Sequence, residues 1–389
     1  MREVAVLGVG MTKFGVSEKT QLEMFGEAAM DAINESNIKL TDIQQVLVGS
    51  SDAEISEGQH VIASMCAGEI GLAGLPATRF EGACAGSMMA IRDAFMWVAS
   101  GFYDFVLAGG TERQQIMGTS LATRVMNMGM HSTYESPTGL TFPGIFAMMA
   151  HLYAHKYGIP LPQLKEAMAR VAIKNHKNAT HNPKAHFQKE ISLWDAFSAM
   201  MVSTPLQLYD CCPMSDGAAA VVIAPLELAR KLVKKPVVIA GVGQSSAASL
   251  CSQKDIARVS ARENSSRQAY KMAGLTPKDI DLAEVHDCFT IAEIVATEGL
   301  GFFDFGDGWK AVERGDTQIG GKIPINPSGG LKAKGHPVGA TGAAQAYEVV
   351  KQIRGECGER QVEGAKIGMT DTIGGTLASI GNCILKRGW

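Results

Sequence analysis

The sequence has no long apolar run, no strong excess of charge of either sign, and no cysteine pair spaced for metal binding. Its 389 residues include 36 Lys and Arg against 39 Asp and Glu, for a formal net charge of -3. This balance gives no reason to expect nucleic acid or an anionic membrane surface as a partner. No apolar run approaches the ~20 residues of a membrane span. The amino-terminal MREVAVLGVGMTKFG also lacks the longer apolar stretch and cleavage site of a signal peptide. We therefore expect a globular protein of the cytoplasm.

Eight cysteines are scattered along the chain, and none belongs to a C-x-x-C motif. In the cytoplasm they should be reduced, and the missing motif argues against a structural zinc site. We therefore predict no bound metal. Most cysteines, including the adjacent Cys211 and Cys212, are expected to pack in the core as small side chains.

A repeat divides the chain into two similar halves. The segments VAVLGVGMT (4–12) and VVIAGVGQS (237–245) are short apolar strands that end in G-V-G. Each is followed by a helix-like stretch and then by LTDIQQVLVGS (40–50) or LTPKDIDLAEVHD (275–287), where a Leu-Thr turn precedes a strand. Two matching pairs in the same order predict a duplicated β/α unit and a layered α/β fold.

The middle of the chain has a different composition. Residues 114–204 are rich in Met, His, Asn and Lys and show plausible helices, such as 146–158, but few strand-like runs. We expect an insertion that covers a site or binds substrate. The predicted organisation is 1–113 for the first part of the N-terminal half, 114–204 for the insertion, 205–230 for the returning segment, and 231–389 for the C-terminal half.

The first candidate for chemistry is Cys84, in ATRFEGACAGSMMAIRDAFMWVASG (77–101). A short strand leads to G-A-C-A-G, and the helix-like segment that follows is apolar on nearly every face, so it should be buried. The positive end of the helix dipole should lower the pKa of this cysteine and make it nucleophilic. The alternative is a core cysteine at a strand–helix turn.

Two further segments carry histidines with possible chemical roles. NPSGGLKAKGHPVGATGAAQAYEVV (326–350) holds His336 among closely spaced glycines, which let backbone approach a ligand. A histidine fixed there can act as a base or donate to an oxyanion. DLAEVHDCFTIAE places His286, Asp287 and Cys288 in succession. In an extended segment, His286 and Cys288 should face one side, and Asp287 the other, as a structural residue or helix N-cap.

Together these segments resemble the thiolase family. NPSGGLKAKGHPVGATG (326–342) resembles that family's Asn-x-x-Gly-Gly…Gly-His-Pro-x-Gly-Ala-Ser/Thr-Gly motif. LAGGTER (107–113) resembles its Gly-Gly-x-Glu strand end, and SDGAAAVV (215–222) its Asp-Gly-Ala-Ala strand. The resemblance runs essentially from end to end. It implies the α/β thiolase fold, which has a duplicated five-layered αβαβα core with an inserted loop domain.

The chain departs from the common thiolase pattern at the second catalytic cysteine. Most thiolases place it in a late Cys-x-Gly-Gly motif, where this chain reads DTIGGT (371–376) with Thr372 at the cysteine position. They also have Asn-Glu-Ala-Phe where this chain has HDCF (286–289). The resemblance to sterol-carrier-protein-type and archaeal thiolases implies that Cys288 takes over the role.

The same resemblance implies a role for each site residue. Cys84 is the nucleophile that an acyl-CoA acylates, and His336 takes its proton. Cys288 is the acid or base at the α-carbon of a second acyl-CoA. His336 and a water held by His286 stabilise the enolate oxygen, and the backbone N–H groups of Cys84 and Gly374 stabilise the thioester oxygen. Two oxyanion sites suit a Claisen condensation. The residues that bind the CoA moiety are not identified by the sequence.

The implied activity is that of an acyl-CoA C-acyltransferase, which condenses two acetyl-CoA to acetoacetyl-CoA and free CoA for hydroxymethylglutaryl-CoA and mevalonate synthesis. It needs no cofactor beyond the coenzyme A of its substrates. A homodimer or dimer of dimers is implied, as is a complex with hydroxymethylglutaryl-CoA synthase through a small zinc-ribbon and OB-fold protein.

Three alternatives stay open. A thiolase could degrade longer or branched 3-ketoacyl-CoA. A decarboxylating ketoacyl synthase could share the fold, although it needs no base such as Cys288. An inactive thiolase-fold scaffold or lipid-binding subunit belongs to a different functional class.

Two other histidine patterns have structural and functional interpretations. His151 and His155 have the spacing of two zinc ligands on a helix, but H-E-x-x-H is absent, so an ordinary helix face is preferred. A basic run could bind the phosphates of coenzyme A or equally be a solvated surface; it comprises Lys174, His176, Lys177, His181, Lys184 and His186.

Overall fold

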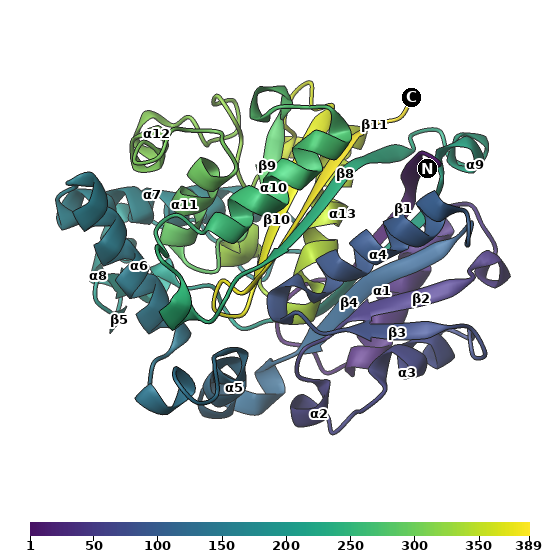
Figure 1. The fold of residues 1–389 in the computed structure, drawn as a ribbon, viewed down its shortest axis with the longest axis horizontal. Coiled ribbons are helices and arrows are strands. Elements are labelled where there is room, and N and C mark those ends of the chain that lie inside the picture. Colours follow the sequence, from purple (N-terminus) through teal and green to yellow (C-terminus); the bar gives the residue numbers. More distant parts are fainter.

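A nine-stranded mixed β-sheet runs through the computed structural model, which describes residues 1–389 (Figure 1). The strands of this sheet are β1 (Val4–Met11), β2 (Gln45–Gly49), β3 (Ala77–Phe80), β4 (Val106–Arg113), β7 (Asp216–Pro225), β8 (Val237–Ser246), β9 (Leu282–Glu284), β10 (Ile367–Gly374) and β11 (Ser379–Arg387). Their order across the sheet is β3-β2-β4-β7-β1-β8-β11-β10-β9. Two more strands, β5 (Met201–Ser203) and β6 (Leu206–Gln207), form a separate pair.

The two halves of the sheet have the same strand order, as the sequence repeat predicts. The run β2-β4-β7-β1 corresponds to β9-β10-β11-β8, with one parallel pair followed by antiparallel pairs in each. The repeated Leu-Thr segments form 3₁₀ turns at Leu40–Asp42 and Pro277–Asp279, which lead into β2 and β9. The halves join where β1 pairs with β8 through Ala5–Val238 and Val6–Val237.

The helices lie outside and between the halves of the sheet. They are α1 (Gln21–Glu35), α2 (Ala53–Ser56), α3 (Ile62–Glu69), α4 (Gly86–Ser100), α5 (Gly118–Met126), α6 (Phe142–Tyr157), α7 (Leu161–Thr180), α8 (Leu193–Ser198), α9 (Leu226–Leu232), α10 (Ser260–Ala273), α11 (Thr290–Gly299), α12 (Gly308–Arg314) and α13 (Thr341–Arg354). Helices α1 and α3 pack on the N-terminal half and α10 on the C-terminal half, whereas α4 and α13 pack on each other and on both halves (Figure 1). These are the five predicted layers.

The central helix layer is buried because its side chains are apolar or small. Ile91 and Val98 of α4, with Val349 and Ile353 of α13, belong to one buried apolar cluster that also includes strand residues from both halves. Burial of such side chains stabilises the fold by roughly 1.5–3 kcal/mol each. The same packing holds the amino ends of α4 and α13 close together, where the candidate site lies.

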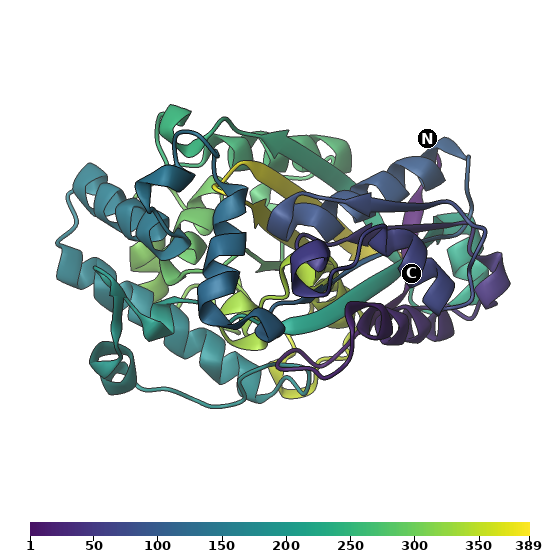
Figure 2. The same ribbon diagram turned by 90° about the horizontal axis from the view of Figure 1, so that it is seen from below.

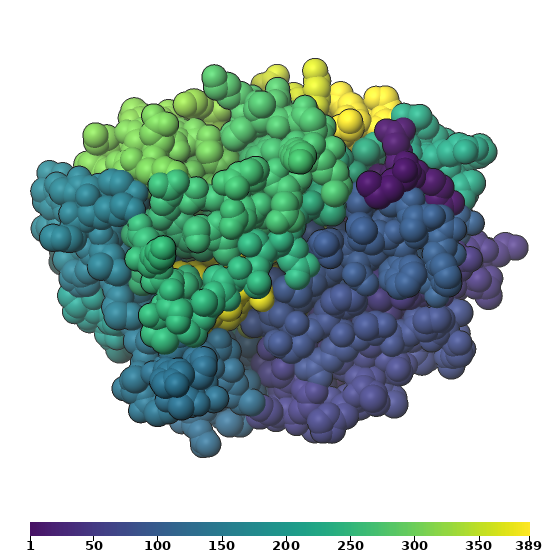
Figure 3. All heavy atoms as spheres, in the orientation of Figure 1, coloured from purple at the N-terminus to yellow at the C-terminus, as the bar shows by residue number.

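The inserted residues 114–204 contribute no strand to the nine-stranded sheet. Helices α6 and α7 pack with α11 around a second buried cluster, which includes Phe146, Leu164 and Ile291. Figures 2 and 3 show the insertion, in blue to teal, beside the green C-terminal half. The residues at which the predicted domains begin and end stay predictions. No helix of the structure is both long and apolar enough to cross a membrane.

Candidate active site

Cys84 lies in a sharp turn between β3 and α4. The turn is the 3₁₀ segment Ala83–Ala85, and α4 begins at Gly86. Ala83 has a φ of 47°, a left-handed conformation that is unfavourable for a residue with a Cβ. Its N–H donates to Glu81 Oε1 at 2.8 Å, which helps to hold the turn. Cys84 is therefore presented, half-buried, in the wall of a cavity.

The cavity has a volume of about 320 Å³, and Cys84, Cys288, His286 and His336 all line it. Its most apolar part comes from the insertion, through Val125, Met126, Met128, Gly129, Phe142 and Phe146. The insertion thus covers the site, as its position in the sequence suggested.

His336 is held from its backbone and from its ring. Its N–H donates to Ser215 Oγ at 3.1 Å, and its Nδ1 lies 2.8 Å from Thr341 Oγ1. The Thr341 hydroxyl donates to the Pro337 carbonyl at 2.9 Å, so it accepts the proton of His336 Nδ1. This leaves the lone pair on Nε2. Burial, together with the positive Lys334, lowers the pKa of His336 to about 3, so the ring is neutral and can accept a proton.

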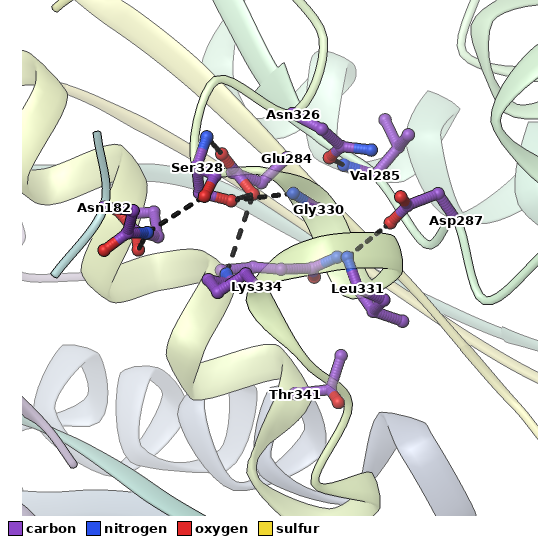
Figure 4. Close-up of polar contacts among 12 residues, drawn as sticks. Asn182, Glu284, Val285, Asp287, Asn326, Ser328, Gly330, Leu331, Lys334 and Thr341 are labelled. Carbon is purple, nitrogen blue, oxygen red and sulfur yellow. Dashed lines mark hydrogen bonds and ion pairs between the residues drawn. The ribbon is translucent and has the colours of Figure 1, made fainter. Parts of the chain in front are cut away.

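The loop that carries His336 is tied to the HDCF segment by Asp287 (Figure 4). The Asp287 carboxylate accepts the N–H groups of Leu331 at 2.7 Å and Lys332 at 3.2 Å, and the side-chain amide of Asn175 at 2.7 Å. Leu331 and Lys332 lie in the π-helical turn Gly330–Lys334, a rare form that is frequent at functional sites. Asp287 is therefore structural and does not cap α11, whose N-cap residue is Phe289.

A second carboxylate holds the other side of the same loop. Ser328 donates its N–H and its hydroxyl to Glu284 at 3.0 and 2.6 Å, and the Lys334 ammonium lies 3.7 Å from Glu284 (Figure 4). Because these groups are buried, their mutual contacts replace hydration that they would otherwise lose. The glycine-rich loop is thus rigid where it approaches Cys84.

His286 and Cys288 both line the cavity, whereas Asp287 faces the opposite side. The rings of His286 and His336 have centroids 5.1 Å apart and planes at 83°. One potential ligand atom from each of Cys84, His286 and His336 lies within 4.8 Å of the other two. Three segments that are distant in sequence therefore meet at one point.

Gly374 lies against the turn that precedes Cys84. A Cβ at Gly374 would come within 1.9 Å of the Gly82 carbonyl oxygen, so only glycine fits there. Its neighbours Ile373 and Gly375 line the cavity. Thr372, at the position of the family's second cysteine, donates to Gln345 at 2.6 Å and is fully buried away from the cavity.

The cysteine thiols of the cavity are protonated at neutral pH. Burial, and after it the nearby Glu112 carboxyl group, raises the pKa of Cys84 to about 12. The predicted lowering by the helix dipole is wrong, because Cys84 precedes α4 and desolvation of the thiolate outweighs the dipole. Burial also raises the pKa of Cys288 well above its ordinary value. To act as a nucleophile, Cys84 therefore needs a base nearby, and the neutral His336 imidazole in the same cavity can accept its proton.

Several cavity residues were missed or misplaced by the sequence analysis. Cys212 was expected in the core, but it lines the cavity, and its N–H donates to the Cys288 carbonyl at 2.9 Å. Asp52 and Gln114 also line the cavity. They follow β2 and β4, which are parallel neighbours, and ligand sites favour the carboxyl ends of parallel strands. That rule could have found Asp52 and Gln114, whereas no pattern marked Cys212.

The basic run is largely internal, so it does not form a continuous solvated surface, and binding of coenzyme A by its accessible members stays a prediction. Lys174 is buried and lies 2.8 Å from Glu293. His176 Nδ1 lies 3.0 Å from the Lys189 carbonyl, and His186 Nδ1 lies 2.9 Å from Ser215 Oγ. Only Lys177 and His181 of the run are exposed. His151 and His155 are exposed on α6, as the helix-face interpretation predicts.

The Cys84, His286 and His336 cluster in the cavity offers ligand types that suit a soft cation. Zinc binds cysteine thiolate and imidazole, and Cys84, His286 and His336 provide them within 4.8 Å of one another. Ligand atoms in a tetrahedral zinc site lie about 3.5 Å apart, so a zinc ion would draw these groups closer. The absence of a metal stays a prediction.

Comparison with known proteins identifies the family. Residues 4–227 match the model of the thiolase N-terminal domain, and residues 243–387 match the thiolase C-terminal domain-like model. The chain is 45% identical over 389 residues to an acetyl-CoA acetyltransferase of Methanothermobacter thermautotrophicus, with 100% of both chains covered. It is 34% identical to sterol carrier protein 2 of Bos taurus, with 95% of this chain and 70% of that protein covered. The solved Ltp2-ChsH2(DUF35) aldolase matches with a TM-score of 0.84 and 27% identity, over 99% of this chain and 98% of that chain.

The chain belongs to the thiolase family. The family assignment made from the glycine-rich motif and the GHP segment is confirmed, as is the thiolase fold, and the protein is an enzyme of this family.

Proposed function

We propose that the protein condenses two acetyl-CoA to acetoacetyl-CoA and free CoA through an acetyl-Cys84 intermediate. The observation that carries this proposal is the convergence of Cys84, His286 and His336 on a cavity that also holds the Cys288 thiol. The 45% identity to an acetyl-CoA acetyltransferase supports acetyl-CoA as the substrate.

The first step is transfer of the acetyl group to Cys84. His336 Nε2 takes the thiol proton as Cys84 Sγ attacks the thioester carbon, and the departing CoA thiolate takes that proton from His336. A neutral, oriented imidazole suits both roles. The backbone N–H groups of Cys84 and Gly374 stabilise the oxyanion of this step.

In the second step, Cys288 passes its thiol proton to His336 Nε2, and the resulting thiolate removes a proton from the α-carbon of another acetyl-CoA. The enolate attacks acetyl-Cys84, Cys84 leaves as a thiolate and takes the proton back from His336, and Cys288 keeps the α-proton, so the protons balance. Burial makes the Cys288 thiolate a strong base because its pKa is raised. His336 and a water held by His286 stabilise the enolate; His286 Nδ1 is buried without a partner, which supports this role. No cofactor takes part beyond the CoA of the substrates.

The test is α-proton exchange of acetyl-CoA in deuterated buffer, with the mass of the protein measured in parallel. Wild type should form acetyl-enzyme, exchange and condense. Cys288→Ala should form acetyl-enzyme without exchange or condensation, Cys84→Ala should not become acetylated, and the exposed Cys251→Ala is the matched control. Normal condensation by Cys288→Ala would show that the α-carbon base lies elsewhere. Failure of wild type to acetylate would favour a scaffold over an acetyl-CoA enzyme.

We also propose a homodimeric or tetrameric assembly and a partner that links the enzyme to hydroxymethylglutaryl-CoA synthase, for mevalonate synthesis in the cytoplasm. The name of the Ltp2-ChsH2(DUF35) aldolase joins a second protein to a chain of this fold, which supports a protein partner. Light scattering of the purified protein tests the oligomer. The complex is tested by co-expressing the protein with the synthase and the zinc-ribbon/OB-fold protein and measuring co-purification. Each of the two partners is then omitted in turn.

A further inference from the structure

The cavity holds a third thiol, that of Cys212, which the proposed reaction does not use. Cys212 and Cys288 lie opposite each other on two antiparallel segments: Cys211 forms a β-bridge with Phe289, and the Cys212 N–H donates to the Cys288 carbonyl at 2.9 Å. Opposite residues of an antiparallel pair direct their side chains to the same face, with Cβ atoms about 4.5–5.5 Å apart. Both side chains line the cavity, so the two thiols are neighbours there.

The segment that carries Cys212 is held in place by its neighbours. The side chain of Lys332 is buried and donates to the Cys211 carbonyl. The Cys211 side chain does not line the cavity, and its thiol donates to the Gln207 carbonyl at 3.6 Å. Of the two adjacent cysteines, Cys212 is therefore the one that faces Cys288.

The proposed second step places a negative charge on Cys288 in a buried position. Burial raises the pKa of Cys288 because an anion there loses its hydration, so hydrogen-bond donors are needed around the sulfur. Cys84 is acetylated at that stage and has no proton to donate. Asp287 faces the other side, where its oxygens accept N–H groups. The two histidines of the cavity serve the enolate oxygen, so Cys212 is the side chain that remains.

Cys212 can supply such a donor because it keeps its own proton at neutral pH. Burial raises the pKa of this thiol as well, and the opposing effect of the Lys332 ammonium is smaller. A thiol is a weak donor to a neutral acceptor, but hydrogen bonds to an ionised acceptor are about twice as strong. The S–H group of Cys212 therefore gains most when Cys288 is a thiolate.

We propose that Cys212 is a positioning residue that donates a hydrogen bond to the Cys288 thiolate and so favours its formation. This inference rests on the proposed role of Cys288 as the base at the α-carbon. Cys212 keeps its proton throughout, so the proton balance of the reaction is unchanged. The backbone N–H of Phe289, which also lowers the pKa of Cys288 against the larger effect of burial, is present in every variant of Cys212.

The experiment measures two reactions of each variant: acetylation of Cys84 by intact mass, and α-proton exchange of acetyl-CoA in deuterated buffer. Cys212→Ala and Cys212→Val remove the donor, so exchange should slow by about 3- to 10-fold, less than for a strong donor to an ion because a thiol donates weakly. Acetylation should stay within about twofold of wild type. Cys212→Ser keeps a donor and should restore exchange to within about twofold. Cys211→Ala, adjacent but outside the cavity, is the matched control and should change neither reaction.

Alkylation of Cys288 gives a second readout, which a loss of packing would move in the opposite direction. In a Cys84→Ala background, iodoacetamide is applied from about pH 7 to about pH 10, and the Cys288 peptide is measured by mass with the exposed Cys251 as internal reference. Cys212→Ala should lower the Cys288 rate by about threefold at each pH, because the smaller thiolate fraction is partly offset by greater nucleophilicity. A purely steric effect of the smaller side chain would open the cavity and raise the rate. Cys212→Ser should match the background.

Exchange at the wild-type rate by both donor-free variants would overturn the inference, as would a Cys212→Ser variant that is as slow as Cys212→Ala. Equal losses of acetylation and exchange would also overturn it, because they indicate damaged packing. The proposed function is contradicted if wild type does not acetylate Cys84, or if Cys288→Ala exchanges normally, and the inference then falls with it. Exchange that depends on Cys288 but not on Cys212 contradicts the inference alone.

Discussion

His336 Nδ1 lies 2.8 Å from Thr341 Oγ1, and the Thr341 hydroxyl itself donates a hydrogen bond to the Pro337 carbonyl oxygen at 2.9 Å. The hydroxyl proton is thereby occupied, so the ring proton is held on Nδ1 and Nε2 keeps its lone pair. Thr341, which lies outside the proposed reacting groups, thus sets the tautomer of His336, the proposed base.

Thr341→Val should slow the acylation of Cys84 because the imidazole loses the acceptor that fixes its tautomer. We expect a decrease of about 10- to 100-fold, within the range of general-base contributions. Thr341→Ser keeps the hydroxyl and should stay within a few-fold of wild type. Single-turnover acetylation by acetyl-CoA, measured across pH, checks this. Equal rates for the Val and Ser variants would contradict the assigned tautomer.

Alkylation of Cys84 in the free enzyme should increase steadily with pH. Because the pKa of Cys84 is raised to about 12, the thiolate fraction should rise about tenfold per pH unit from about pH 7 to about pH 10. Mass spectrometry of the Cys84 peptide after brief exposure to iodoacetamide measures the rate, and Cys84→Ala gives the background. A plateau below about pH 9 would show a resting thiolate–imidazolium pair instead.

Asp287→Asn should change how stability depends on pH. Burial and the neighbouring Glu293 raise the pKa of Asp287 to about 7, above its value of ~3.9 in an unfolded chain. The folded protein therefore binds the proton more tightly, so this contribution to stability is complete below about pH 4 and is lost as the pH rises through 7. Asp287→Asn has no carboxyl group at this position, so its stability should not fall over this pH range for that reason.

Urea unfolding of wild type and Asp287→Asn at about pH 5 and pH 8 measures the difference. Relative to the urea midpoint of wild type, the midpoint of Asp287→Asn should be higher at about pH 8 than at about pH 5. The exposed Glu363→Gln serves as control. A gap that is independent of pH would contradict the raised pKa.

Gly374→Ala should damage both the fold and the site. The added Cβ would meet the Gly82 carbonyl oxygen at 1.9 Å, so the turn that presents Cys84 must move. We expect destabilisation by about 1–3 kcal/mol and slower acetylation of Cys84. Gly68→Ala, where a Cβ on α3 meets nothing within 4 Å, should retain wild-type stability and rate. A Gly374→Ala enzyme that acetylates normally would show that this close approach is unimportant.

Much of the fold and part of the site follow from local sequence patterns. The repeated G-V-G strands became β1 and β8 at equivalent places in the two halves, because apolar strand patterns and turn residues act over short stretches of chain. The alternation along HDCF placed His286 and Cys288 on the cavity side, since side chains of an extended segment alternate. The glycine-rich motif around His336 identified the family before any contact was known.

Other properties depend on contacts between distant segments, and only the tertiary structure decided them. Desolvation, and not the helix dipole, sets the pKa of Cys84, and burial depends on everything that packs around a group. The basic run turned inward because its members found partners such as Glu293 and Ser215 elsewhere in the chain. Asp52, Gln114 and Cys212 share a cavity because separate strands and loops converge there. The sequence by itself determined the family and the chemical groups, whereas tertiary packing determined their charge, their orientation and the shape of the cavity around them.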